Sequence, residues 1–364
     1  MPDERESSHG VMEGGGSYNR HARVPADGGG LALPLLEQAA QNIALDAGDQ
    51  PVVIADYGSS QGKNSLAPMR AVIRVVRTRV GPDRPISVVH VDQAANDFNT
   101  LFDVLDRDPE RYSVDDPNVF PSAIGRSFYQ NVLPREQVHL GWSSYAAVWL
   151  NHIPMLIPGH FISVASSGEV RKAFERQAAA DWELFLSLRS MELRDGGRLV
   201  VVLPGLNDEG VSGFEPLFRG ARSALAEMVA EGTITDDECT HMVLGSCPRR
   251  RCELLAPFSA DGQFCGLAVE HCEVTGLPDA AWTEYERDGN KELLANRHAG
   301  FFRSIFVPSL ALALSDSDKR QIFAVAMEQK LVRSMVEQPA PFHSFVQMMV
   351  LAKKGATPTS VVRS

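Results

Sequence analysis

Two aspartates stand directly after short apolar runs, where a carboxylate could bind a sugar. Asp56 follows Val52–Ala55, and Asp92 follows Ile86–Val91. If both runs are parallel strands, their carboxyl ends lie at the edge of the sheet where α/β proteins bind ligands. An acid after the second strand can accept hydrogen bonds from both hydroxyls of a ribose. The alternative role of Asp92 is to cap the N-terminus of the next helix.

The loop after Asp56 indicates which kind of nucleoside would fit. Its glycines, Gly58 and Gly62, give G-x-x-x-G and not the G-x-G-x-x-G of dinucleotide sites. Glycine allows the backbone to approach a ligand closely, but the phosphate-binding pattern is missing. S-adenosylmethionine carries no phosphate and would not need that pattern.

Aromatic side chains in two further segments could complete a site. In GRSFY (125–129), Ser127 and Phe128 could bond to and stack on an adenine, although Phe128 could equally be a core residue. Tyr145 and Trp149 are four residues apart in a predicted helix, 145–150, and so share one face. Their alternative role is a packed core pair. An indole N–H donates one hydrogen bond and cannot accept, which suits a carboxylate oxygen.

These residues depend on a sheet to bring them together. Short apolar runs alternate with segments of helical periodicity, which predicts an α/β fold with a mostly parallel sheet covered on both faces. The predicted strands are 52–55, 86–91, 138–142, 198–203, 264–274 and 345–351. The predicted helices are 31–47, 64–79, 98–106, 145–150, 169–193, 216–231, 236–242 and two within 291–336.

The lapse of this alternation after Pro204 predicts an insertion. We expect a flexible tail over residues 1–16, a cofactor-binding α/β core over 17–204, a helical substrate-binding cap over 205–262, further core and cap helices with a terminal strand over 263–354, and a C-terminal tail over 355–364.

Composition excludes several classes of partner. The net charge of −11 argues against nucleic acid. We expect no membrane partner and a cytoplasmic location, because no apolar run is long enough to span a bilayer and no secretory signal begins the chain. The basic run Arg249–Arg251 is predicted to be a solvated turn. Five cysteines without a Cys-x-x-Cys pair predict ordinary thiols and no metal site.

Several segments together resemble a known family. In order they are GGGSYNRHARVP (14–25), ADYGSSQGKN (55–64), VDQAANDFN (91–99), GRSFYQNVLP (125–134), WSSYAAVWLNHIP (142–154) and DGGRLVVVLPG (195–205). They are similar to the SABATH family, the salicylate, benzoate and theobromine-type methyltransferases, in its bacterial branch. The resemblance implies a class I, Rossmann-like methyltransferase core, a helical cap inserted after the fifth strand, and a homodimer.

The resemblance also implies roles for particular residues. The cofactor would be S-adenosyl-L-methionine, and its contacts would come from Tyr18, Asp56, Gly58, Asn64, Asp92, Gln93, Ser127 and Phe128. The substrate would contact Trp149, Tyr145, His21, Leu217 and Phe218. The reaction would be methylation of a small carboxylic acid, aromatic or medium-chain aliphatic, by in-line transfer without a general base. Methylation of a nitrogen or hydroxyl is the alternative.

The chain departs from the family at two positions. The family commonly has serine and glutamine where this sequence has Ala22 and Pro25. The glutamine would bind the substrate carboxylate, so a second donor must come from elsewhere, with His21, Asn19 and His152 as the candidates. The cation ligands that some plant members carry in the cap are absent from the matching stretch, 240–243, which again predicts no metal.

Overall fold

Parallel pairing of five strands forms the centre of the fold. Within residues 10–355, which the computed structural model describes, eight strands form one sheet in the order β3-β2-β1-β4-β5-β8-β7-β6. β1 pairs in parallel with β2 and β4, β2 with β3, and β4 with β5, whereas β8 is antiparallel to β5 and β7. The strands are β1 Val52–Tyr57, β2 Ile86–Asp92, β3 Val119–Gly125, β4 Val138–Ser144, β5 Leu193–Gly205, β6 Gln263–Phe264, β7 Leu267–Leu277 and β8 Ser344–Lys353. The predicted α/β fold with a mostly parallel sheet is confirmed.

Helices cover both faces of the sheet because strand side chains alternate between them. Val52 and Ile54 belong to a buried cluster with α3 and α4, while Tyr57 packs its ring edge-to-face on Phe185 of α6. Within residues 10–355 no helix is long and apolar enough to cross a membrane. The helices are α1 Ser17–His21, α2 Arg23–Leu31, α3 Leu33–Asn42, α4 Leu66–Val80, α5 Phe98–Arg107, α6 Gly168–Glu192, α7 Glu215–Ala230, α8 Asp236–His241, α9 Arg251–Leu255, α10 Ala280–Asp288, α11 Lys291–Ala311 and α12 Ser317–Glu337.

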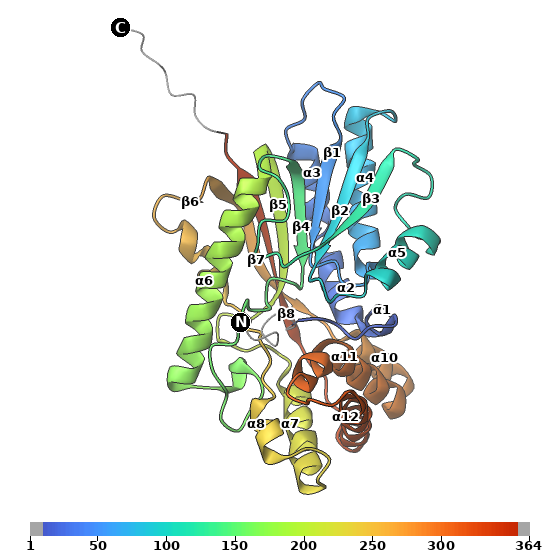
Figure 1. Cartoon of the computed structure of the whole chain (residues 1–364), viewed down its shortest axis with the longest axis vertical. Coiled ribbons are helices and arrows are strands. Elements are labelled where there is room, and N and C mark those ends of the chain that lie inside the picture. Colours follow the sequence, from blue (N-terminus) through green and yellow to red (C-terminus); the bar gives the residue numbers. More distant parts are fainter. Residues whose placement is uncertain (1–9, 356–364) are drawn as a thin grey trace.

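A second group of helices gathers beyond one end of the sheet. Figure 1 shows α7, α8, α10, α11 and α12 together there, with α1 beside them. Of these, α7 and α8 come from the predicted cap segment 205–262, and α10 to α12 come from the segment that follows it. The predicted helices over 216–231 and 236–242 correspond closely to α7 and α8.

The sequence patterns missed β3 and the helices α1, α2, α9 and α10, and the reason is clearest for β3 and α2. β3 is largely exposed and contains Pro121, so it lacks both the apolar run and the alternation of a strand. Proline is tolerated there because β3 is the edge of the sheet. α2 contains three consecutive glycines, which oppose helix formation, so its packing against the rest of the protein must stabilise this helix.

The predicted helix over 145–150 is wrong. Tyr145 has a left-handed backbone (φ 58°), and Trp149 forms a β-bridge with Ser246. Backbone bonds from Leu150 to Gly245 and from Cys247 to Val148 continue that pairing. Tyr145 and Trp149 therefore share no helical face. Long-range pairing with residues 245–247, which the local sequence does not reveal, determines this conformation.

Arg249 stabilises the same segment, residues 145–150. Its side chain is buried, not solvated as predicted, and it donates hydrogen bonds to the carbonyl oxygens of Ala147 and Ala178. The basic run therefore begins with a structural residue. A charge run gives no signal of burial when its partners are backbone carbonyls distant in sequence.

The predicted N-terminal tail is wrong for residues 10–16. Glu13 accepts two hydrogen bonds from Arg303 of α11, and its backbone N–H donates to Ser304. The Gln61 side chain also donates to the Glu13 carbonyl. This segment is thus fixed against the helices at the end of the sheet. Residues 1–9 and 356–364, which hold the rest of the two predicted tails, lie outside the described residues.

A buried ion pair joins α6 to the sheet and to the loop after β3. Arg189 is fully buried, lies 4.4 Å above the Tyr57 ring, and donates to the Phe128 carbonyl oxygen at 2.6 Å. Its partner Glu192 accepts from the Tyr57 hydroxyl and from two backbone N–H groups, at Val132 and Leu133. This cluster fixes the loop that carries Phe128.

Replacing Arg189 with methionine should destabilise the protein by about 3–5 kcal/mol, because Glu192 would remain as an uncompensated buried charge. Urea unfolding would measure the loss. The matched control is Arg107→Met on the surface, which should change the unfolding free energy by less than about 0.5 kcal/mol. Equal effects of the two changes would contradict a structural role for the buried pair.

Candidate functional site

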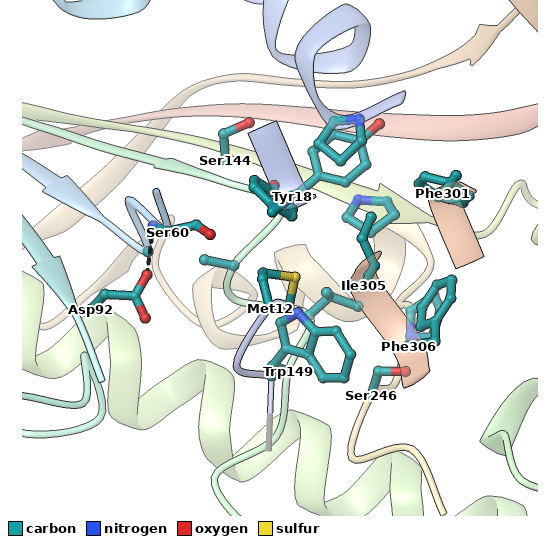
Figure 2. Close-up of a pocket in the computed structure, with 18 of the residues that line it drawn as sticks. Met12, Tyr18, Ser60, Asp92, Ser144, Trp149, Ser246, Phe301, Ile305 and Phe306 are labelled. Carbon is teal, nitrogen blue, oxygen red and sulfur yellow. Dashed lines mark hydrogen bonds between the residues drawn. The ribbon is translucent and has the colours of Figure 1, made fainter. Parts of the chain in front are cut away.

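A cavity lies between the carboxyl ends of the parallel strands and the helices beyond them. Its walls include residues that follow β1, β2 and β4, and residues of α7 and α11. They enclose about 990 Å³ not filled by protein atoms, open solvent included. Figure 2 shows Asp92 and Ser60 on one side and Trp149, Phe306 and Phe301 on the other.

Asp92 is presented to the cavity by the end of β2. Its carboxylate accepts backbone hydrogen bonds from Ser60, at 2.7 Å, and from Gln93, at 2.8 Å. Burial raises the pKa of Asp92 to about 6, despite these two bonds. The N-cap of the next helix is Asp97, whose side chain accepts from the Thr100 N–H. The capping alternative for Asp92 is therefore wrong.

Gly58 lines the cavity at a point where no other residue fits. Its φ is 90°, and a Cβ there would lie 2.1 Å from the Cβ of Ala146. The loop after β1 can thus approach the segment after β4 closely. Gln93, which was predicted to contact the cofactor, lines the cavity beside Asp92.

The segment 125–129 contributes one of its two predicted residues. Phe128 lines the cavity and also packs on Tyr129 and Phe185, so its ring belongs both to the core and to the cavity wall. Ser127 does not line the cavity, and its hydroxyl accepts a hydrogen bond from the Tyr129 N–H. Ser127 belongs to the turn that presents Phe128.

Three further residues predicted to contact the cofactor, Tyr18, Asp56 and Asn64, also differ in whether they line the cavity. Tyr18 lines the cavity, but Asp56 and Asn64 do not. Asp56 is buried inside the sheet edge, where its carboxylate accepts from Ser65 and lies 3.0 Å from His90. Asn64 donates to the Ala22 carbonyl and supports Tyr18. Asp56 and Asn64 therefore act behind the wall of the cavity.

The other half of the cavity is apolar. Trp149 lies in its wall with Met12, and Gly10 packs so closely on the indole that a Cβ there would be 2.9 Å from Cγ. Of the two cap residues predicted to contact the substrate, Phe218 lines the wall, whereas Leu217 is a core residue that does not line it. The rest of the apolar wall includes Phe214, Phe301, Ile305, Phe306, Val148 and Ile162.

The predicted replacements for the family's glutamine lie elsewhere. Pro25 lines the cavity, as the resemblance implies for position 25. His21, however, packs against Gly300 and lines a separate hollow with His298, and Asn19 donates to the Gln61 carbonyl. His152 is exposed. The hydroxyls that do line the cavity belong to Tyr18, Ser60, Ser144, Tyr145, Ser212 and Ser246.

The cavity is almost uncharged. Among the described residues in its wall, Asp92 alone has a charged side chain. Burial raises the pKa of the Tyr18 and Tyr145 hydroxyls well above the usual value, so both remain protonated donors at neutral pH. Within residues 10–355 no group of three His, Cys, Asp or Glu side chains could hold a metal ion.

Sequence reasoning missed the N-terminal contribution. Gly10 and Met12 both line the cavity, although they fall in the predicted tail. The only signal is Glu13, an acid within a glycine-rich stretch, whose partner Arg303 is 290 residues away. No local pattern links such a pair.

Comparison with known proteins decides the family. Residues 7–354 match the sequence model of the SAM dependent carboxyl methyltransferases. The chain belongs to this family. Members of this family depend on S-adenosylmethionine, so this is the cofactor against which the residues of the cavity are compared.

Individual relatives are more distant. A methyltransferase of Gibberella fujikuroi is 31% identical over 237 residues, covering 64% of this chain and 63% of that protein, so the chain spans less than two thirds of this relative's length. The salicylate carboxymethyltransferase of Clarkia breweri is 27% identical over 305 residues, covering 79% and 81%. These relatives are fungal and plant, so they give no support to the expected bacterial branch. A solved structure of loganic acid methyltransferase with SAH has a TM-score of 0.76 at 21% identity, covering 94% of this chain and 99% of that one, and shares the fold.

The residues present fit the cofactor. The Asp92 carboxylate has acceptor capacity beyond its two backbone bonds, which suits a ribose diol. The buried Ser60 hydroxyl, on the loop beside it, has no partner within the protein. The Phe128 ring offers a flat apolar surface for a planar base, and the Gly58 backbone forms the wall beside it.

Replacing Asp92 with asparagine should weaken S-adenosylmethionine binding by about 1–3 kcal/mol, the cost of leaving hydrogen-bond partners unpaired. Isothermal titration at pH 7.5 would measure the dissociation constant. Asp106→Asn, at an exposed site on α5, is the matched control and should bind normally. Equal affinity of the Asp92 variant and the wild type would contradict the ribose assignment.

The same titration at lower pH tests the role of the charge. Asp92 is ionised above a pKa of about 6 and protonated below it, so wild-type affinity should fall between pH 7 and pH 5. For a single group the decrease is at most about tenfold per pH unit. The asparagine variant, which cannot titrate there, should lack this dependence, and an identical dependence in both proteins would assign it to another group.

Proposed function

We propose that this protein transfers the methyl group of S-adenosylmethionine to the carboxylate of a small apolar acid, forming a methyl ester. The observation that carries the proposal is the chemistry of the apolar half of the cavity. Its polar groups are neutral donors, and the described residues place no histidine, lysine or second carboxylate in its wall. Such a wall can hold an acceptor that is already ionised, but it offers no base to deprotonate one.

A carboxylic acid meets that condition. Carboxyl groups have pKa values of about 4 and are ionised at neutral pH, so no proton has to be removed before methylation. Bound S-adenosylmethionine would supply an activated methyl group on a cationic sulfur. The work left to the protein is to orient the acceptor oxygen and to exclude water, and both increase the rate without acid–base chemistry.

Particular residues would divide this work. Asp92 and the Gly58 loop would hold the cofactor, and the Trp149 indole N–H would donate to one carboxylate oxygen. Phe218, Phe301 and Phe306 would surround the rest of the acid and exclude water. Their apolar surface suits an aromatic ring and a medium-length aliphatic chain equally well.

A nitrogen or hydroxyl acceptor is the second candidate. Pro25 favours it, because this residue lines the cavity and offers no side-chain donor for a carboxylate oxygen. A hydroxyl acceptor would require a base, and Asp92 is the one charged group in the described wall.

We also infer a homodimer with a cytoplasmic location and a substrate-binding cap over residues 205–262. Light scattering of the purified protein would test the dimer.

A labelled-methyl assay tests the function directly. Aromatic acids, fatty acids of graded length and N-heterocycles would be offered at saturating S-adenosylmethionine. We expect acids to be methylated, with kcat/KM constant above pH 6 because no general base has to ionise. A preferred acceptor without a carboxyl group, or a rate that increases through pH 7–9, would replace this proposal with the second candidate.

Replacing Trp149 with phenylalanine should keep most of the packing area and remove the indole donor. Loss of a hydrogen bond to a charged group costs about 1.5–3 kcal/mol, so kcat/KM for the preferred acid should fall roughly 10- to 150-fold. The dissociation constant of S-adenosylmethionine should remain unchanged, because the ribose and adenine contacts are elsewhere. A variant with full activity would show that Trp149 is only a packing residue.

A further inference from the structure

A run of three glycines in α2 has no explanation in the helix itself. Gly28, Gly29 and Gly30 lie within the helix Arg23–Leu31, although glycine inside a helix is destabilising relative to alanine. Their surroundings differ. A Cβ on Gly30 would meet nothing within 4 Å, and one on Gly29 would lie 3.1 Å from the Ser144 hydroxyl oxygen.

Gly28 is the position where a side chain is excluded. A Cβ there would lie 2.2 Å from the hydroxyl oxygen of Tyr145 and 2.7 Å from two of its ring carbons. The phenol therefore crosses the helix backbone at the one point without a side chain. Any other residue at position 28 would force Tyr145 to move.

The Tyr145 hydroxyl is held there without a partner. It is buried and has no hydrogen bond within the protein, and its residue has a strained backbone with φ 58°. Buried hydroxyls are nearly always hydrogen-bonded, and an unpaired one requires an explanation. Tyr145 lines the cavity together with Trp149 and Pro25, and Pro25 precedes Gly28 by three residues on the same side of α2.

We propose that Gly28 is a specificity-determining position that directs the Tyr145 hydroxyl into the apolar half of the cavity. There the hydroxyl donates the second hydrogen bond to the substrate carboxylate. Trp149 donates the first. Because Gly28 has no side chain, the Tyr145 hydroxyl can take the position from which it supplies the donor that Pro25 lacks. This inference rests on the proposed function and names the second donor of the same site.

The ionisation state of Tyr145 agrees with this role. Burial raises the pKa of its hydroxyl, and the nearby Tyr18 and Asp27 act in the same direction. The phenol therefore remains protonated and acts as a donor, not as a base. A carboxylate is the acceptor that such a donor binds most strongly.

Three single variants separate this role from a structural one. Tyr145→Phe and Gly28→Ala should each lower kcat/KM for the preferred acid, the first by about 10- to 150-fold. Gly30→Ala is the matched control on the same helix and should retain full activity. The dissociation constant of S-adenosylmethionine and the melting temperature are measured for all three. A weakened cofactor affinity in Tyr145→Phe would overturn the proposal and assign the hydroxyl to the cofactor.

Rescue provides the decisive test. A glutamine at position 25 would carry an amide donor on the same side of α2 as Gly28, so Pro25→Gln introduced into Tyr145→Phe should recover at least tenfold of the lost kcat/KM. A structural role for Tyr145 predicts no recovery. The combination of Gly28→Ala with Tyr145→Phe should cost less than the sum of the two single changes, because the same hydrogen bond cannot be lost twice.

The wild-type assay distinguishes this inference from the function on which it rests. If the wild type methylates no acid, the proposed function fails first. If the wild type methylates acids and both Tyr145→Phe and Gly28→Ala leave kcat/KM unchanged, only the inference about Gly28 is overturned.

Discussion

Parallel pairing of β1 with β2 and β4 is the constraint on which the site depends. Asp56 of β1 lies in register with His90 on one side and Trp142 on the other. The three strands therefore end together, and the loops that follow them meet at one edge. That edge brings Gly58, Asp92 and Tyr145 into one cavity although they are distant in sequence. Each strand is buried on both faces, so a slip of the register by one residue would move every side chain to the opposite face and disrupt its packing there.

Buried polar groups on both faces of the sheet stabilise this edge. The Asp56 carboxylate accepts from Ser65 and lies beside His90, whose other ring nitrogen contacts the Tyr112 hydroxyl at 2.8 Å. On the opposite face, Arg189 and Glu192 fix the loop of Phe128. A buried charge that has lost its partner is costly, so these clusters favour one arrangement of the cavity wall. The groups facing the cavity are mostly neutral, which suits a methyl acceptor that is already ionised when it binds.

The approach of the backbone at glycines completes the geometry. At Gly58 the loop after β1 contacts Ala146, and at Gly28 the helix α2 contacts Tyr145. Both contacts involve the segment after β4, whose conformation is fixed by pairing with residues 245–247 and by the buried Arg249. The N-terminal segment is attached through Glu13 to Arg303, and its Gly10 packs on the Trp149 indole. The apolar half of the cavity is thus assembled from segments that are far apart in the chain.

The sequence by itself determined the parallel core and the end of β2. Apolar runs of the right length specify buried strands wherever they occur, so Asp92 and Gly58 could be placed at the cavity in advance, whereas Phe128 follows β3, which those runs did not reveal. Only the tertiary structure decided which neighbours face it: Asp56, Asn64, Ser127, His21 and Leu217 do not line it, and Gly10 and Met12 do. Local patterns specify burial and periodicity. They do not specify the bridge at Trp149, the glycine helix α2 or the Glu13–Arg303 pair, because each is stabilised by partners far away in the chain.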